Sequence, residues 1–322
     1  MTVSVVVPIY NGAKFLPECI DCLSKQEYVD MEVIFVVDSK TTDNSLDMID
    51  SLSGSLQSVR TVIQTDSKRV SGARNLGIRE AKGDILWFLD VDDHPLPDFL
   101  SSLVGIMEDT GADVVFCNHL QETKRIVPEV PERNYGIKVF TGAEAVSDFT
   151  RFPVYPWSRI QRTSIFSGDE AFFYDHLTAE DIEQTIRTLA LSEKVAYYNR
   201  PLYVYYKIGG SFSFRNRSKE AEAMEETARR TLEFVGEKRP EALNGFRIRL
   251  LERVMRQIAF VQYRDFSKAY RSSIAHELLK EVDSKTTEMK VFSLSRMLYY
   301  SILYPFTHWI WDGKTGLWDN EV

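Results

Sequence analysis

Cysteine is scarce in this chain, with three among 322 residues. So few cysteines imply no disulfide framework and favour a reducing compartment. Two of them, Cys19 and Cys22, form a CxxC pair. Both fall within the apolar spacing of an expected helix and not at its N-terminus, where a redox pair usually lies. We therefore interpret them as small core-facing residues and expect a cytoplasmic protein.

Basic residues are in the minority, since 39 Lys and Arg face 47 Asp and Glu for a net charge of −8. This composition provides no general basic surface, so no nucleic-acid partner is expected. The chain opens on a strand-like run, residues 3–7, without the basic region and cleavage site of an export signal. Export is therefore not expected.

Long apolar runs are missing as well. The longest uncharged run, residues 297–311, is interrupted by Pro305 and His308 and falls short of the ~20 apolar residues that a spanning helix needs. The surrounding segment, residues 291–318, is nevertheless rich in aromatic side chains. Two interpretations stay open: an interfacial helix in peripheral contact with the cytoplasmic membrane face, or a helix packed on the protein or on a partner subunit of a homo-oligomer.

A regular alternation of strand and helix patterns is present in the first half of the chain. Apolar runs at residues 3–7, 32–37, 59–64 and 85–89 predict strands, and helical spacing follows the first three. This alternation predicts an α/β fold with a doubly wound, mostly parallel sheet that binds ligands at the carboxyl ends of its strands. The remaining pattern predicts strands at 113–118 and 202–206, a polar loop or exposed hairpin at 121–135, and C-terminal helices at 219–234, 240–263 and 267–282.

Two aspartates, Asp90 and Asp92, come directly after the fourth strand. Because alternate strand residues point the same way, we expect their carboxylates to share a face, with Asp93 pointing elsewhere or opening the next loop. Such a pair suits Mg²⁺ or Mn²⁺ holding a diphosphate, since a cation offsets the repulsion. Chance gives about seven acidic pairs at one fixed spacing here, so the prediction depends on their position after a buried strand. The alternative is a turn whose aspartates cap the helix starting near Pro97.

Four blocks of residues point to one known family: Val5–Asn11 (VVVPIYN), Val36–Asp43 (VVDSKTTD), Ala73–Ile78 (ARNLGI) and Phe88–Asp93 (FLDVDD). Through them the chain resembles the family 2 inverting glycosyltransferases of GT-A fold. The second block departs from the family at Ser39, Lys40 and Thr41, where the family has Asp, Gly and Ser. The resemblance implies a GT-A catalytic domain over residues 1–215, with a donor half at about 1–118 and an acceptor half at about 119–215, followed by a helical C-terminal region at 216–322.

The resemblance also implies a donor site made by Pro8, Tyr10, Asp38, Arg69, Arg74 and Asp90. Pro8, Tyr10 and Asp38 line the nucleotide base. Arg69 or Arg74 reaches the base or the diphosphate. Asp90 contacts the ribose side, and Asp92, with Asp90, binds the Mg²⁺ or Mn²⁺ that bridges the diphosphate oxygens. Two alternatives stay open: a helix-surface ion pair for Arg74, and strand-end packing for Tyr10.

The implied catalytic base is Asp181, which opens an expected helix together with Glu180. Glu180 and Trp157 are the implied acceptor contacts. A carboxylate within hydrogen-bond reach of the attacking hydroxyl typically contributes a factor of ~10² to 10⁴. The residues alone leave alternatives open: an interaction of the acidic pair with the helix dipole, and core packing of Trp157.

The sequence thus predicts a metal-dependent, inverting glycosyltransferase. It would move a sugar from a nucleoside-diphosphate sugar, with uridine as the leading nucleotide, to a hydroxyl of a glycan or lipid-linked acceptor. A Gln-x-x-Arg-Trp segment, typical of processive relatives, is absent, so one transfer per encounter is expected. P-loop, GxGxxG and HExxH motifs are also absent, while His94 is a further candidate for a metal or phosphate contact. Two other classes stay open: a catalytically degenerate nucleotide-sugar-binding scaffold, and a nucleotidyltransferase that uses the same acidic pair.

Overall fold

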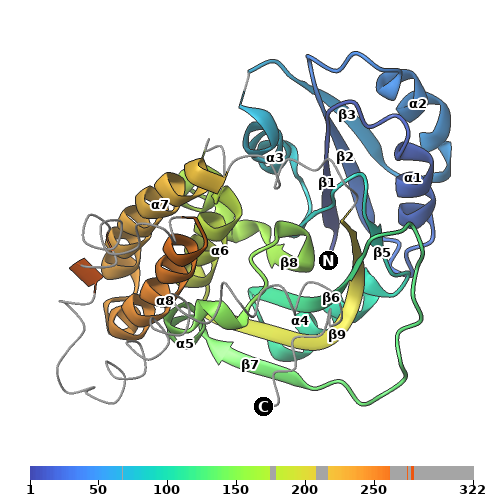
Figure 1. Ribbon diagram of the computed structural model, residues 1–322. Coiled ribbons are helices and arrows are strands. Elements are labelled where there is room, and N and C mark those ends of the chain that lie inside the picture. Colours follow the sequence, from blue (N-terminus) through green and yellow to red (C-terminus); the bar gives the residue numbers. More distant parts are fainter. Residues whose placement is uncertain (67, 175–178, 208–216, 262–273, 275–276, 279–322) are drawn as a thin grey trace. The chain divides into compact units, whose positions relative to one another are not determined.

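The computed structural model describes residues 1–66, 68–174, 179–207, 217–261, 274, 277 and 278 (Figure 1). The chain divides into two compact units. The first comprises Met1–Gly142, Phe152–Asp175 and Glu180–Gly209, and the second comprises Ala143–Arg151, His176–Ala179 and Gly210–Val322. The first unit contains the sheet, and the second contains the C-terminal helices.

Strands and helices alternate through the first half of the chain, as the apolar runs predict. The strands are β1 (Val3–Ile9), β2 (Met31–Asp38), β3 (Val59–Gln64), β4 (Ile85–Phe88), β5 (His94–Pro95), β6 (Val114–Glu122), β7 (Ile137–Thr141), β8 (Arg159–Arg162) and β9 (Lys194–Tyr206). The α-helices are α1 (Leu16–Ser24), α2 (Ser45–Leu52), α3 (Arg69–Glu80), α4 (Phe99–Thr110), α5 (Gly142–Ser147), α6 (Glu180–Leu191), α7 (Arg217–Lys238) and α8 (Leu243–Val261).

The strands of the described residues form one nine-stranded sheet in the order β3-β2-β1-β4-β8-β6-β9-β5, and β7 also pairs with β9. β3, β2, β1 and β4 are parallel neighbours, as are β6 and β9, whereas β8 runs antiparallel between β4 and β6. The direction of winding reverses at β1, and such switch points are where α/β sheets bind ligands. The predicted doubly wound, mostly parallel α/β fold is confirmed.

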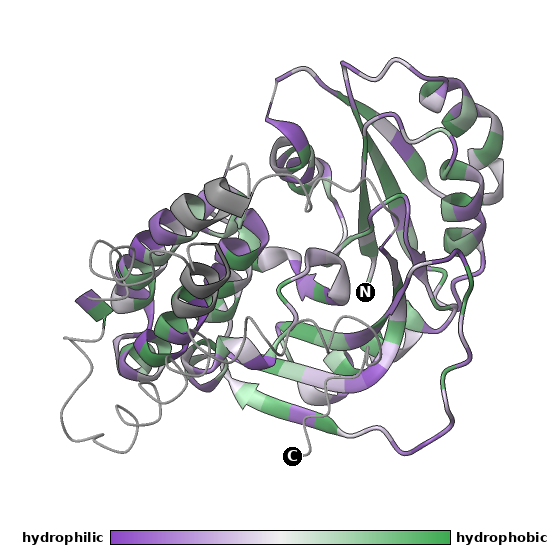
Figure 2. Ribbon diagram, viewed as in Figure 1, coloured by the Kyte–Doolittle hydropathy of each residue, from purple (hydrophilic) through white to green (hydrophobic). Residues whose placement is uncertain are grey.

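Both faces of the central strands are buried, which explains their uninterrupted apolar sequences (Figure 2). Val5 and Val7 of β1 belong to a core shared with α1, α2 and α4, and Val6 belongs to a core shared with α3. A Cβ at Gly77 of α3 would lie only 2.2 Å from Val6 Cγ1. Helix α3 therefore packs directly on β1. This contact fixes the position along β1 of Arg74, which lies one helical turn before Gly77.

In the second unit α7 and α8 pack on each other, and Phe246 of α8 lies 5.4 Å from the ring of Phe149. These helices confirm two of the three expected C-terminal helices. The third, residues 267–282, falls almost wholly outside the described residues, as does the aromatic segment 291–318. Within the described part of the chain, no helix combines the length and apolar character that crossing a bilayer requires.

Candidate active site

Three neighbouring strands carry predicted site residues at one edge of the sheet. Tyr10 follows β1, Asp38 is the last residue of β2, and Asp90 follows β4 by two residues. Because β2, β1 and β4 are parallel neighbours, their carboxyl ends meet at this edge. The structure therefore brings together residues from three of the four blocks that resemble the family.

The loop after β1 is held by the loop after β2. Thr42 N donates to Asn11 Oδ1 (2.8 Å), and Ala13 N donates to Asp43 Oδ2 (3.0 Å). Asn11 adopts a left-handed conformation (φ 50°), which Asn tolerates better than most residues. Tyr10 in this loop is 62% exposed, so its ring is not packed on the strand end and is accessible to a ligand.

The turn after β2 has Asp38 at its base. Asp38 Oδ1 accepts a hydrogen bond from Lys40 N (2.8 Å), and Asp38 O accepts one from Thr41 N (2.9 Å). Ser39 and Lys40, where the chain departs from the family pattern, are exposed, and Pro8 in β1 is half-buried. The departure at these two residues thus lies on the exposed surface of the turn.

Two predicted donor contacts, Arg69 and Arg74, lie on α3. Arg69 opens the helix in a left-handed conformation (φ 54°), and its carbonyl accepts from buried Gln64 Nε2 (3.1 Å). Arg74 is buried, pairs with Asp90 (Nη2 to Oδ1, 3.0 Å) and lies 5.2 Å from the ring centroid of Phe173. Its Nε has no hydrogen-bond partner among the described residues. The ion pair exists, but it joins a buried Arg74 to a half-buried Asp90 at the strand end and is not on a helix surface.

The acidic residues after β4 lie in a turn and not on the strand. Because β4 ends at Phe88, the expectation that strand alternation aligns Asp90 and Asp92 is wrong; Asp93 N instead donates to Asp90 O (3.1 Å). The two carboxylates are still neighbours, since burial and then the charge of Asp90 raise the pKa of Asp92. No three His, Cys, Asp or Glu of the described residues converge on a metal position. Two carboxylates fit a Mg²⁺ or Mn²⁺ ion that water and a diphosphate also ligate.

Asp93 ties this turn to β9. It is 2% exposed and accepts from Tyr203 Oη (3.0 Å) and from Tyr206 N (3.1 Å). Burial, with the charges of the two preceding aspartates, raises its pKa well above the usual value. The next helix, α4, begins at Phe99 without a side-chain cap, so the alternative of a capping turn is not observed.

Arg125, between β6 and β7, is a site residue that the sequence did not reveal. Arg125 Nη1 donates to Asp92 O (3.0 Å), and its Nε and Nη2 donate to Glu18 Oε2 (2.9 and 2.6 Å). It therefore fixes the backbone of the acidic turn to α1. One arginine in a polar loop gives no sequence signal.

His94 contacts α1 in this structure. His94 Nδ1 lies 3.2 Å from Glu18 Oε1 and 3.2 Å from the sulfur of Cys22. Cys19 and Cys22 are free, buried thiols, and burial raises the pKa of Cys22 to about 12. These positions agree with the interpretation of the CxxC pair as core residues.

A second acidic pair, Glu180 and Asp181, opens α6. Asp181 Oδ1 accepts from Ile182 N (2.8 Å). Burial and then the charge of Asp181 raise the pKa of Glu180 to about 7. Arg74 acts in the opposite direction, and Asp90 adds to the rise. The start of α6 therefore lies close enough to Arg74 and Asp90 for their charges to act on Glu180.

Replacing Glu180 by Gln is expected to change how stability depends on pH in the metal-free protein. Below pH 4.5 the carboxyl is protonated in both the folded and unfolded chains. As the pH rises from 4.5 through about 7, the unfolded chain releases its proton first, and up to about 3 kcal/mol of stability is lost. Calorimetry should show Glu180→Gln melting above wild type at pH 8 but not at pH 4. An equal difference at both pH values would contradict this, and Glu129→Gln, in an exposed loop, is the control.

Trp157, the predicted acceptor contact, is buried in an aromatic stack. It is 3% exposed and stacks on Tyr155 (centroids 4.8 Å apart) and on Tyr203 (4.3 Å). This position corresponds to the alternative of core packing. Tyr155, 38% exposed, is the ring of the stack that reaches the surface.

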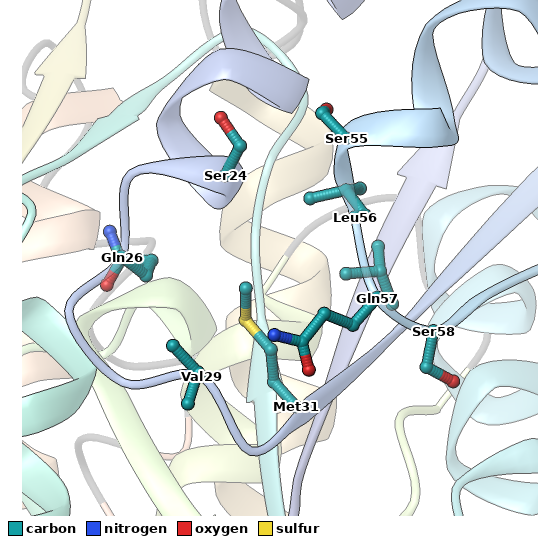
Figure 3. A pocket seen from close by; sticks show the side chains of 9 residues that line it. Ser24, Gln26, Val29, Met31, Ser55, Leu56, Gln57 and Ser58 are labelled. Carbon is teal, nitrogen blue, oxygen red and sulfur yellow. The ribbon is translucent and has the colours of Figure 1, made fainter.

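A pocket at the opposite ends of the strands is not suited to a diphosphate (Figure 3). Ser24 at the end of α1, Met31 at the start of β2 and Gln57 before β3 are among its lining residues. None of the residues that line it is charged. This pocket is therefore not a candidate for the donor site.

Comparison with known proteins agrees with this geometry. Residues 4–166, just over half of the chain, match the sequence profile described as "Glycosyl transferase family 2". The chain belongs to this family. The predicted family and enzyme class are therefore confirmed.

The relatives include two bacterial proteins. The chain is 29% identical over 209 residues to the uncharacterized glycosyltransferase EpsJ of Bacillus subtilis, covering 63% of this chain and 60% of EpsJ. It is 25% identical over 207 residues to poly(ribitol-phosphate) beta-N-acetylglucosaminyltransferase TarS of Staphylococcus aureus, covering 64% of this chain and 35% of TarS. The chain thus spans less than two thirds of either relative.

Solved structures of two proteins match the fold. TarS 1–349 in complex with UDP-GlcNAc has a TM-score of 0.64 at 19% identity, covering 94% of this chain and 82% of that chain. The mannosyltransferase PcManGT of Pyrobaculum calidifontis, in complex with GDP-Man and Mn²⁺, has a TM-score of 0.53 at 17% identity, covering 97% and 88%. The predicted GT-A-like fold is confirmed.

Proposed function

We propose that this protein is a metal-dependent, inverting glycosyltransferase that acts once per encounter. It moves a sugar from a nucleoside-diphosphate sugar, with uridine as the leading nucleotide, to a hydroxyl of a glycan or lipid-linked acceptor. The observation that carries the proposal is that Arg74 and Asp90, which form an ion pair at the end of β4, also act by their charges on Glu180, next to Asp181 at the start of α6. The proposed catalytic domain spans residues 1–215, and the helical region spans 216–322.

Each residue of the site has a distinct task in this proposal. Asp38 and Tyr10 bind the base, and Arg74 orients Asp90 toward the ribose. Asp92, with Asp90, holds Mg²⁺ or Mn²⁺, which when bound neutralises the charge of the leaving diphosphate. Asp181 accepts the proton of the acceptor hydroxyl. Attack from the face opposite the diphosphate then inverts the anomeric centre.

The named relatives support a hexose-type donor. TarS is named as an N-acetylglucosaminyltransferase and is solved with UDP-GlcNAc, and PcManGT is solved with GDP-Man and Mn²⁺. Both a uridine and a guanosine donor therefore belong in the first screen. The uridine donor leads because the structure with the higher TM-score, TarS 1–349, is solved with UDP-GlcNAc.

The test is a thermal-shift screen of UDP, GDP and their sugars with and without Mn²⁺, followed by measurement of nucleoside diphosphate release. We expect one nucleotide series to raise the melting temperature only with Mn²⁺, and its sugar to be slowly hydrolysed. Binding without hydrolysis would favour a scaffold. Release of diphosphate from a nucleoside triphosphate would favour a nucleotidyltransferase.

A further inference from the structure

A buried layer of polar side chains joins β8 to α6. Arg159 and Gln161 of β8, and Gln184 and Thr188 of α6, are all fully buried. Gln184 Nε2 donates to Thr188 Oγ1 (2.8 Å), and Thr188 Oγ1 lies 3.5 Å from Gln161 Oε1. Arg159 Nη2 donates to Gln184 Oε1. This layer attaches the N-terminal half of α6 to a central strand of the sheet.

Arg159 is a buried cation whose contacts are all neutral. Its guanidinium also donates to Tyr155 O (3.2 Å) and to Gln161 Oε1 (3.4 Å), and it lies 5.3 Å from the ring centroid of Phe116. Among the described residues no carboxylate lies within ion-pair distance of it. A buried charge without such a partner is costly, and burial lowers the pKa of Arg159 to about 9. The energetic cost of burying Arg159 without a carboxylate partner suggests that this residue has a functional role.

Asp181 is the acid that acts on this cation. Its charge raises the pKa of Arg159, while the charge of Arg74 lowers it. Gln184 lies three residues after Asp181, so the two share one side of α6 about one turn apart. The guanidinium that holds Gln184 therefore lies next to the turn that carries Asp181.

We propose that Arg159 is a positioning residue for Asp181: it anchors the start of α6 and supplies the positive charge that keeps the Asp181 carboxylate ionised beside Glu180. This inference rests on the proposed function, in which Asp181 is the base. The charged groups at the start of α6 include Arg159 from β8 and Glu180 from α6, both of which interact with Asp181, and Arg74 from α3, which interacts with both of them. Arg74 is already paired with Asp90, whereas Arg159 has no carboxylate partner of its own.

The test compares kcat as a function of pH for Arg159→Gln and Arg187→Gln. Arg187, on α6, is the matched control because it is buried like Arg159 but forms an ion pair with Glu183 (3.1 Å). For Arg159→Gln we expect kcat to fall about tenfold or more while the KM for the donor stays within about threefold. We also expect the acid limb of the kcat–pH profile, the pH range in which kcat rises with pH, to move up by about one pH unit. For Arg187→Gln we expect a lower melting temperature and an unmoved acid limb.

A second variant, Gln184→Glu, decides the question if Arg159→Gln does not fold. Its new carboxylate can pair with Arg159, so the fold is retained while the positive field at Asp181 is neutralised. The acid limb should again move up. An unmoved limb in the folded variants, or an equal shift in Arg187→Gln, overturns the inference. Failure of the wild type to transfer or hydrolyse any donor overturns the proposed function instead, so the two failures are distinguishable.

Discussion

Replacing Asp181 by Asn is expected to lower kcat by about 10²- to 10⁴-fold while leaving donor affinity within about threefold. The amide oxygen of Asn can still accept the hydrogen bond from Ile182 N, so the start of α6 should keep its geometry. Because the amide cannot accept a proton at neutral pH, the rate of sugar transfer should fall while donor binding is unchanged. Steady-state release of nucleoside diphosphate and calorimetric titration of the donor measure the two quantities separately.

The control for this variant is Asp169→Asn, in the exposed short helix before α6. It removes the same charge from the same unit without touching the site, and kcat is expected to stay at the wild-type value. If Asp181→Asn turns over at the wild-type rate, Asp181 is not the base. A parallel loss of donor affinity would instead assign it to donor binding.

Replacing Asp92 by Asn is expected to abolish the dependence of donor binding on Mn²⁺. The carboxylate is a ligand that a hard cation prefers, and burial next to Asp90 already raises its pKa in the metal-free protein. We expect the dissociation constant of the nucleotide in Mn²⁺ to rise about 100-fold, which corresponds to about 2.7 kcal/mol. Titration of the nucleotide with and without Mn²⁺ measures the effect.

Asp93→Asn is the matched control because it changes the adjacent carboxylate of the same turn. Asp93 accepts from Tyr203 and from the backbone of Tyr206, so its replacement should lower the melting temperature and leave the Mn²⁺ effect on binding in place. A variant of Asp92 that still binds the nucleotide more tightly in Mn²⁺ than without it would remove Asp92 from the metal site.

The ends of the parallel strands could be predicted from sequence because their cause is local. An uninterrupted apolar run is typical of a strand buried on both faces, and the polar residue that follows it lies where the strand meets solvent. This reasoning predicts that Asp38 and Asp90 lie at the carboxyl ends of their strands. The run does not specify the residue at which the strand ends, so the sequence could not decide whether Asp90 and Asp92 lie on the strand or in a turn.

The acceptor side depends on contacts between distant segments, and there the sequence was a poor guide. The alternation in Arg159–Arg162 is typical of a strand with one face in water, yet β8 is central and its polar face is covered by polar residues of α6. The burial of Trp157 likewise depends on Tyr203, from a strand that follows much later in the chain. Neither partner can be identified without the fold.

The position of β8 has a consequence for synthesis on the ribosome. β3, β2, β1 and β4 can pair as soon as they emerge, because all four lie within the first 88 residues. β6 emerges after the short strand β5 and helix α4, but it reaches β4 only through β8, which runs antiparallel to both. A nascent chain that ends before residue 159 therefore exposes one edge of β4 and both edges of β6, because β8 and β9, the neighbours of β6, come later in the chain. Unpaired strand edges of this kind favour aggregation or chaperone binding. The strand that carries Arg159 is the one that closes this gap.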